Sequence, residues 1–237
     1  MKTLRVLVVF LLMAAPASAQ LLTSRPWVVG LDYGIYYPTN TGYSRLGLGA
    51  CTDLAVCGGV PYVIGTDSQI WQGDMKGNWM PRMDFPRCQR ISAGPDGSLY
   101  AIGADSGVYR LLPTWARLGL GMGPDVAADE DAVYVIGTDR CVWQWNGISW
   151  SPYNVFAHGQ RVAAGGGQVY ILGMDNAVYS VTQGSQARLG WSVGREIAVS
   201  NDGTPYVIGL DNGVWRWDGA DWKRQGYVIG QNLCWPR

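Results

Sequence analysis

The chain has 237 residues and carries 18 Lys and Arg against 18 Asp and Glu. This even balance argues against nucleic-acid binding, which requires a basic surface, and against electrostatic docking on anionic membranes. The length suits one large all-β domain. Gly (33), Tyr (13) and Trp (12) are abundant whereas Phe is rare (3). Aromatic rings with a polar tip suit half-exposed surfaces and contacts with sugars or proteins.

The N-terminus predicts a cleaved signal peptide over residues 1–19. Lys2 and Arg5 precede an apolar run over 6–15, and the small residues 17–19 form a cleavage site. The mature chain then begins at Gln20, is slightly acidic, and is secreted or periplasmic. The apolar run is too short to cross a membrane, and no other segment approaches the ~20 apolar residues of a span. We therefore expect no membrane span.

An internal repeat organises the rest of the chain. The phrase Tyr134–Trp143 returns in variant form, and its six copies start near residues 27, 62, 100, 134, 170 and 206. A period of roughly 36 residues indicates a propeller, a solenoid or an array. Each unit shows four short strand signals joined by hairpin-length turns, which is typical of a propeller blade.

Several positions recur in every unit. A Gly and an Asp follow the second strand, and an aromatic residue lies in the third. The aspartates are Asp32, Asp67, Asp105, Asp139, Asp175 and Asp211. We interpret them as turn residues that accept bonds from nearby backbone N–H groups, because six carboxylates dispersed around a ring form neither a metal site nor a catalytic pair. The fourth-strand position carries Tyr43, Trp79, Trp115, Trp150, Gln186 and Trp222.

The two ends of the chain predict closure of a ring. The first unit begins directly with its second strand, near Trp27, whereas residues 230–235 match the first-strand pattern of the later units. The last segment therefore supplies the missing strand of the first blade and leaves no unpaired edge. The sequence predicts one all-β domain over 20–237, a six-bladed β-propeller with four-stranded antiparallel blades closed by the C-terminal strand.

These motifs resemble tectonin-type β-propeller repeats. The resemblance is clearest at Ile197–Trp217 and at Asp139–Trp145, and it covers essentially residues 21–237. The family includes lectins of fish eggs, horseshoe crab and fungi, several of which recognise microbial surface sugars. The resemblance implies glycan binding at shallow sites between neighbouring blades. Lipopolysaccharide or another surface saccharide is then the expected partner.

The candidate carbohydrate-binding residues are tryptophans near the outer rim. An aromatic face there stacks on the apolar face of a sugar, although packing between sheets is the competing role for the same column. The candidates are Trp79, Trp115, Trp150 and Trp222, with Trp145 and Trp217 beside them. Several weak sites on one ring would bind a repetitive surface with avidity. The alternative is a protein–protein interaction scaffold without sugar binding, since a propeller fold does not dictate function.

The five cysteines suggest disulfides in an exported chain. Cys57 and Cys234 fall near one column of adjoining blades, and Cys51 and Cys88 occupy matching offsets, so these are two candidate pairs. Connectivity stays open at this point, and the odd count leaves at least one further thiol.

Enzymatic chemistry is not expected. The single histidine, His158, lies in a loop-like stretch without a partner, and no nucleophile motif accompanies it. The acidic run 129–131 reads as a solvated turn rather than a carboxylate pair for glycoside hydrolysis. We expect no catalytic residues, no metal and no cofactor.

Overall fold

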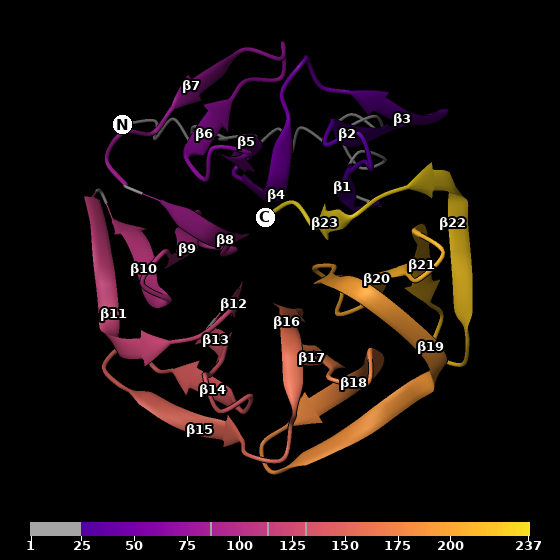
Figure 1. Cartoon of the computed structure of the whole chain (residues 1–237). Helices are drawn as coiled ribbons and strands as arrows, with labels where there is room; N and C mark the ends of the chain where they lie inside the picture. Colours follow the sequence, from indigo (N-terminus) through magenta and orange to yellow (C-terminus); the bar gives the residue numbers. More distant parts are fainter. Residues whose placement is uncertain (1–24, 86, 113, 131) are drawn as a thin grey trace, which may run out of the picture.

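The computed structural model describes residues 25–237 except 86, 113 and 131. Its strands form sheets that stand around a central axis, with one end of each sheet near that axis and the other at the rim (Figure 1). The predicted signal peptide, residues 1–19, lies outside the described residues. No helix among the described residues is long and apolar enough to cross a membrane.

The repeat pattern predicts the strand positions well. The strands nearest the axis are β4 (Cys51–Cys57), β8 (Cys88–Ala93), β12 (Asp125–Asp129), β16 (Gly159–Gly165) and β23 (Asn232–Cys234). The second strands are β1 (Trp27–Val29), β5 (Val60–Gly65), β9 (Leu99–Gly103), β13 (Ala132–Ile136), β17 (Gln168–Gly173) and β20 (Pro205–Gly209).

The third and fourth strands complete each repeat toward the rim. The third strands are β2 (Ile35–Thr39), β6 (Ile70–Gly73), β10 (Gly107–Leu112), β14 (Val142–Trp145), β18 (Ala177–Thr182) and β21 (Gly213–Trp217). The outer strands are β3 (Gly42–Arg45), β7 (Trp79–Pro81), β11 (Thr114–Met122), β15 (Trp150–Asn154) and β22 (Trp222–Ile229). One longer strand, β19 (Ser185–Val199), has a different role.

The prediction of six separate four-stranded blades is wrong. Four sheets are four-stranded blades, with the orders β23-β1-β2-β3, β4-β5-β6-β7, β11-β10-β9-β8 and β12-β13-β14-β15. The last two repeats instead share one seven-stranded sheet, β16 to β22. The cause is β19, which pairs with β18 as far as Val193 and with β20 from Gly194 onward. No proline interrupts this stretch, whereas Pro124 separates β11 from β12 and lacks the N–H that would continue a ladder.

The C-terminal strand lies beside the first strand of the chain. β23 pairs antiparallel with β1, and Trp27, Val28 and Val29 face Cys234, Leu233 and Asn232. The apolar residues between sheets form a series of buried clusters around the axis. One of them joins Val28 and Leu233 to Tyr206 and Ile208 of the sixth repeat. The two ends of the chain thus contribute to the same core.

The turn role predicted for the six aspartates is confirmed. Each Asp accepts a hydrogen bond from the backbone N–H two residues later. Each also accepts a bond from the Tyr hydroxyl or Trp Nε1 four residues later. The residue after each Asp has a positive φ of 60–68°, at Tyr33, Ser68, Ser106, Arg140, Asn176 and Asn212. The Asp therefore stabilises a tight turn and fixes the aromatic ring that follows.

Candidate functional site

Three pockets occupy equivalent places in three repeats. Each is bounded by the outer segment of one sheet and by the second, third and fourth strands of the next sheet. Their volumes are about 740 Å³ in the first repeat, 300 Å³ in the second and 560 Å³ in the fourth. Small-molecule sites commonly occupy roughly 300–1,000 Å³, so each pocket is large enough for a small ligand.

The fourth-repeat pocket is the most aromatic. Trp143 and Trp145 on β14 and Trp150 on β15 line it together with residues 119–122 of β11. The Trp145 and Trp150 rings lie 5.4 Å apart between centroids and are tilted by 50°. All three rings are half-buried and pack against an apolar cluster beneath them. Two exposed apolar side chains of the pocket, Leu120 (90% exposed) and Ile148 (86%), lie at its edge.

A glycine and a backbone carbonyl set the position of Trp150. A Cβ on Gly121 would lie 2.4 Å from the Trp150 ring, so only glycine lets the indole lie against β11. The Trp150 Nε1 donates a hydrogen bond to the Leu118 carbonyl at 2.6 Å. Both contacts link neighbouring sheets. The indole is therefore held at its edge by the fold, and the pocket wall is preformed.

Asp139 fixes the third ring. Its carboxylate accepts hydrogen bonds from the Cys141 N–H at 3.0 Å and from Trp143 Nε1 at 3.1 and 3.2 Å. The carboxylate is exposed at the pocket, so it also presents oxygen atoms to a ligand hydroxyl. An aromatic wall beside a fixed carboxylate suits a sugar ring, which has one apolar face and a rim of hydroxyl groups.

The other two pockets repeat this arrangement. In the first repeat Tyr36 and Tyr43 replace the tryptophans, and the Tyr36 hydroxyl donates to Asp32 at 3.0 Å. This hydrogen bond raises the pKa of Tyr36, and the Gly34 N–H is the first of several bonds that lower the pKa of Asp32. In the second repeat Asp67, Trp71 and Trp79 line the pocket.

The third repeat has the same strands, but the side chain of Phe85 occupies the place of the pocket. Phe85 is only 5% exposed, and its ring lies 5.0 Å from Tyr109 and 4.7 Å from Trp115. Trp115, predicted as a ligand contact, therefore packs in the core beneath Phe85. The segment that supplies Phe85 connects two repeats and does not follow the repeat pattern, so the sequence columns did not reveal it.

The last two predicted tryptophans form a second pair. Trp217 and Trp222 lie 5.3 Å apart, and Trp222 Nε1 donates to the Leu189 carbonyl at 3.0 Å. This geometry matches that of Trp145 and Trp150, but Trp222 is buried. The fifth repeat lacks the ring altogether, because Gln186 occupies its fourth-strand position.

The structure thus separates the six predicted tryptophans. Trp79, Trp145 and Trp150 line pockets, while Trp115, Trp217 and Trp222 pack against apolar clusters. The prediction omitted further lining residues that stand in the same repeating columns. These are Tyr36, Tyr43, Trp71, Trp143, Asp32, Asp67 and Asp139. The recurrence of these columns in the sequence is the signal that identifies them.

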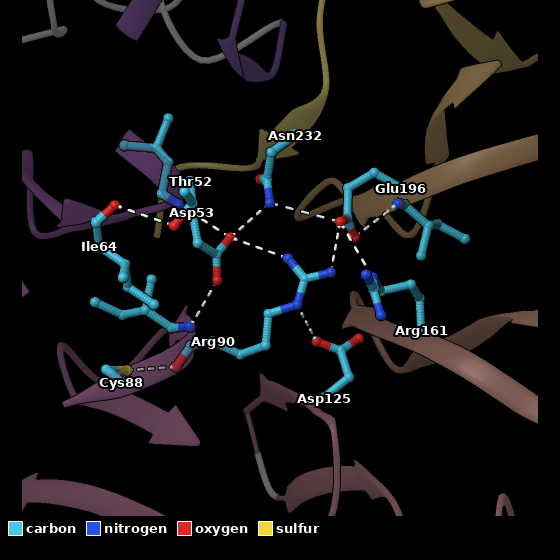
Figure 2. Close-up of polar contacts among 12 residues, drawn as sticks. Thr52, Asp53, Ile64, Cys88, Arg90, Asp125, Arg161, Glu196 and Asn232 are labelled. Carbon is cyan, nitrogen blue, oxygen red and sulfur yellow. Dashed lines mark hydrogen bonds and ion pairs between the residues drawn. The ribbon is translucent and has the colours of Figure 1, made fainter. Parts of the chain in front are cut away.

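A second polar cluster surrounds the central axis, and sequence reasoning missed it (Figure 2). At one equivalent register position, each strand nearest the axis carries a polar side chain. In chain order these are Asp53, Arg90, Asp125, Arg161, Glu196 and Asn232. Acidic and basic residues alternate until the final Asn. This alternation of charge from repeat to repeat is the sequence signal from which the cluster could have been predicted.

Arg90 is the centre of this cluster. Its guanidinium lies 2.7 Å from Glu196, 3.4 Å from Asp53 and 3.5 Å from Asp125. Asp53 also accepts the Ile91 N–H at 2.8 Å and Asn232 Nδ2 at 2.7 Å, so it links three neighbouring strands. The charges hold the inner strands together across the axis.

Burial controls protonation in the cluster. Desolvation raises the pKa of Asp53, and it raises the pKa of Asp125 to about 7, in both cases against the opposing charge of Arg90. The adjoining cavity on the axis is only about 80 Å³, well below the pockets between sheets. A ligand-sized space is therefore found between sheets and not at this cluster.

Neither candidate disulfide is formed in the described part of the chain, where all five cysteines are free thiols. The Cys57 Sγ donates to the Ser98 carbonyl at 3.6 Å, and the Cys88 Sγ donates to the Arg90 carbonyl at 2.9 Å. Each of these sulfur atoms thus has a backbone carbonyl as its partner. Burial raises the pKa of both thiols.

The described residues contain no group of three or more His, Cys, Asp or Glu side chains that would hold a metal ion. His158 is exposed in the connection between β15 and β16. Asp129, at the end of β12, accepts the Gly167 N–H at 2.8 Å, and position 131 lies outside the described residues.

No protein-family model and no curated protein sequence matches this chain. Solved structures do match its fold. The WD40 β-propeller domain of Doa1 superposes with a TM-score of 0.59 at 11% identity, over 89% of this chain and 83% of that one. The chain is a β-propeller.

Two further propellers have bound ligands. The SapL1 lectin in complex with α-methyl fucoside matches with a TM-score of 0.56 at 14% identity, over 89% of this chain and 98% of the lectin. YCF48 bound to a D1 peptide matches with a TM-score of 0.54 at 12% identity, over 85% of this chain and 78% of that one. At these identities the similarity concerns the propeller fold alone.

Proposed function

We propose that this propeller is a secreted or periplasmic, non-enzymatic carbohydrate-binding protein of the tectonin type. One observation carries the proposal: the same aromatic-walled pocket recurs at equivalent positions in three repeats. Recurrent pockets on one ring bind a surface that presents many copies of a sugar with more avidity than any single site provides. The SapL1 lectin, a propeller that binds a fucoside, supports this use of the fold.

The roles of the residues follow from their positions. In the fourth repeat Trp145 and Trp150 form the wall on which a sugar ring stacks. Asp139 accepts hydrogen bonds from sugar hydroxyl groups while it keeps Trp143 in place. The equivalent residues are Tyr36, Tyr43 and Asp32 in the first repeat, and Trp71, Trp79 and Asp67 in the second.

A glycan array tests the proposal. The mature chain Gln20–Arg237 would be screened on immobilised glycans, including bacterial lipopolysaccharides, with and without soluble sugar as a competitor. We expect sugar-competable binding that weakens when Trp145 is replaced by Leu, the residue at the equivalent position 111 of the filled third repeat. Thermal unfolding of the variant establishes that it is folded. Absence of any sugar-competable signal from folded protein would refute the proposal.

A protein-binding scaffold is the second candidate. The exposed apolar side chains Leu120 and Ile148 beside the fourth-repeat pocket favour it, because such side chains also form the centre of protein contacts. YCF48, a propeller bound to a peptide, is an example of this use of the fold. The immobilised mature chain would be incubated with exported proteins. If it retains one of them and millimolar sugar does not displace it, the result would support the scaffold over the lectin.

A further inference from the structure

Another pocket, of about 500 Å³, lies in the sixth repeat beside the turn between β19 and β20. It is lined by the turn 200–202 between β19 and β20, by Tyr206, Arg216 and Gln225, by Trp235 after β23, and by Arg25 before β1. The Tyr206 and Trp235 rings lie 5.1 Å apart. This pocket shares Arg25 and Gln225 with the first-repeat pocket, but Arg216, Tyr206 and Trp235 line none of the three pockets between sheets, so the inference below rests on these three residues.

The third repeat also has an arginine at the position equivalent to Arg216, and there it is neutralised. Arg110 stands opposite Tyr100 in the ladder, as Arg216 stands opposite Tyr206. The Arg110 guanidinium lies 2.5 Å from Asp96 and 2.7 Å from the Ser98 hydroxyl. The third-repeat arginine thus has a carboxylate partner on the preceding turn.

The turn 200–204 of the sixth repeat differs from the turn 94–98 at three residues, and the first of them changes the partner of the aspartate. Position 94 is glycine, whereas the equivalent position is Ser200. The Ser200 hydroxyl donates to Asp202, and the same oxygen of Asp202 accepts the Thr204 N–H at 3.1 Å. Among the described residues, no carboxylate lies within ion-pairing distance of Arg216 or Arg25. Asp202 thus accepts a hydrogen bond from Ser200, whereas Asp96, which follows Gly94, pairs with Arg110.

The result is a pocket with excess positive charge. Arg25 and Arg216 face one carboxylate, Asp202, while the nearby Asp218 lies 3.8 Å from Lys223. Burial raises the pKa of Tyr206, and the charges of both arginines oppose that rise. Both arginines line the pocket together with Tyr206.

We propose that this pocket binds the carboxylate of an acidic sugar residue. A guanidinium presents two parallel N–H donors that match the two oxygens of a carboxylate. Tyr206 and Trp235, which are 4% and 8% exposed, form the buried apolar floor over which the sugar ring that carries it would lie. A bare anion such as phosphate would leave most of a 500 Å³ pocket unfilled.

Isothermal titration calorimetry of the mature chain tests this site, with a galacturonic acid tetrasaccharide as the probe and its methyl ester as the uncharged match. We expect saturable binding of the acid and none of the ester. Arg216→Met and Ser200→Gly should each weaken binding about tenfold, the second because Asp202 becomes free to pair with Arg216. Arg110→Met is the control, since it removes the paired arginine, and should leave affinity unchanged.

Three outcomes would overturn the proposal. Equal weakening by Arg110→Met would show a response to net charge rather than to this pocket. Unchanged affinity of the Arg216→Met variant for the tetrasaccharide, with folding verified by thermal unfolding, would show that Arg216 does not bind the carboxylate. Inorganic phosphate that binds as tightly as the tetrasaccharide and displaces it would indicate a general anion site without sugar recognition.

Discussion

Replacing Arg90 with Met tests how far the central cluster stabilises the propeller. Arg90 is 12% exposed, and its guanidinium lies between Glu196, Asp53 and Asp125 at 2.7, 3.4 and 3.5 Å. Methionine fills part of the space of the arginine stem, so the main loss is charge. The substitution leaves three buried carboxylates and one remaining cation, Arg161, at 3.2 Å from Glu196.

The expected cost follows from burial. Removing one partner of a buried ion pair costs about 3–5 kcal/mol, because the remaining charge stays buried without compensation. Since Arg90 has three carboxylate partners, we expect a loss of unfolding free energy of about 4–5 kcal/mol. The matched control is Arg82→Met. Arg82 pairs with Asp84 at 2.7 Å, but the two side chains are 25% and 41% exposed, and such surface pairs contribute about 0–1 kcal/mol.

Urea unfolding followed by tryptophan fluorescence measures both variants at pH 7 and pH 5. Without Arg90, the buried carboxylates have higher pKa values in the folded state, so acid neutralises them and the deficit should shrink at pH 5. A loss no larger than that of Arg82→Met would refute the reasoning, because it would show that solvent screens the cluster. If Arg90→Met lowers the unfolding free energy strongly and equally at both pH values, the loss comes from packing of the arginine stem rather than from its charge.

Three further predictions concern single side chains. The pKa of Asp125 is about 7 in the folded protein and roughly 4 when unfolded, so the unfolding free energy should fall as pH rises from about 4 to 7. Asp125→Asn should flatten this fall in pH-dependent urea unfolding, and an unchanged slope would contradict the assignment. Phe85→Ala should cost about 3–5 kcal/mol and open the third-repeat site, adding one sugar to the stoichiometry measured by calorimetry; an unchanged stoichiometry would argue against Phe85 as the obstruction. Asp139→Ala should weaken sugar binding and cost about 1 kcal/mol, whereas Asp105→Ala at the filled site should cost the same stability without affecting binding. Equal effects of both on binding would remove Asp139 from the site.

The repeating columns determined most of the local structure. A Gly-x-Asp turn between apolar strands specifies a tight hairpin, and the Asp fixes the aromatic ring four residues later, so both follow from residues close in sequence. The strand positions, the turn bonds and the tryptophan columns could therefore be predicted. The pairs Trp145 with Trp150 and Trp217 with Trp222 follow for the same reason, since they face each other across one hairpin.

Only the tertiary structure decided which repeats have an open pocket. Phe85 fills one site and Ser200 donates a hydrogen bond to Asp202, and both residues depart from the repeating columns. Likewise, β19 merges two repeats into one sheet because it pairs with β18 as far as Val193 and with β20 from Gly194 onward. The Arg90 cluster joins residues up to 179 positions apart. Local patterns specify hairpins, whereas contacts between repeats depend on how the connecting segments place distant side chains around the axis.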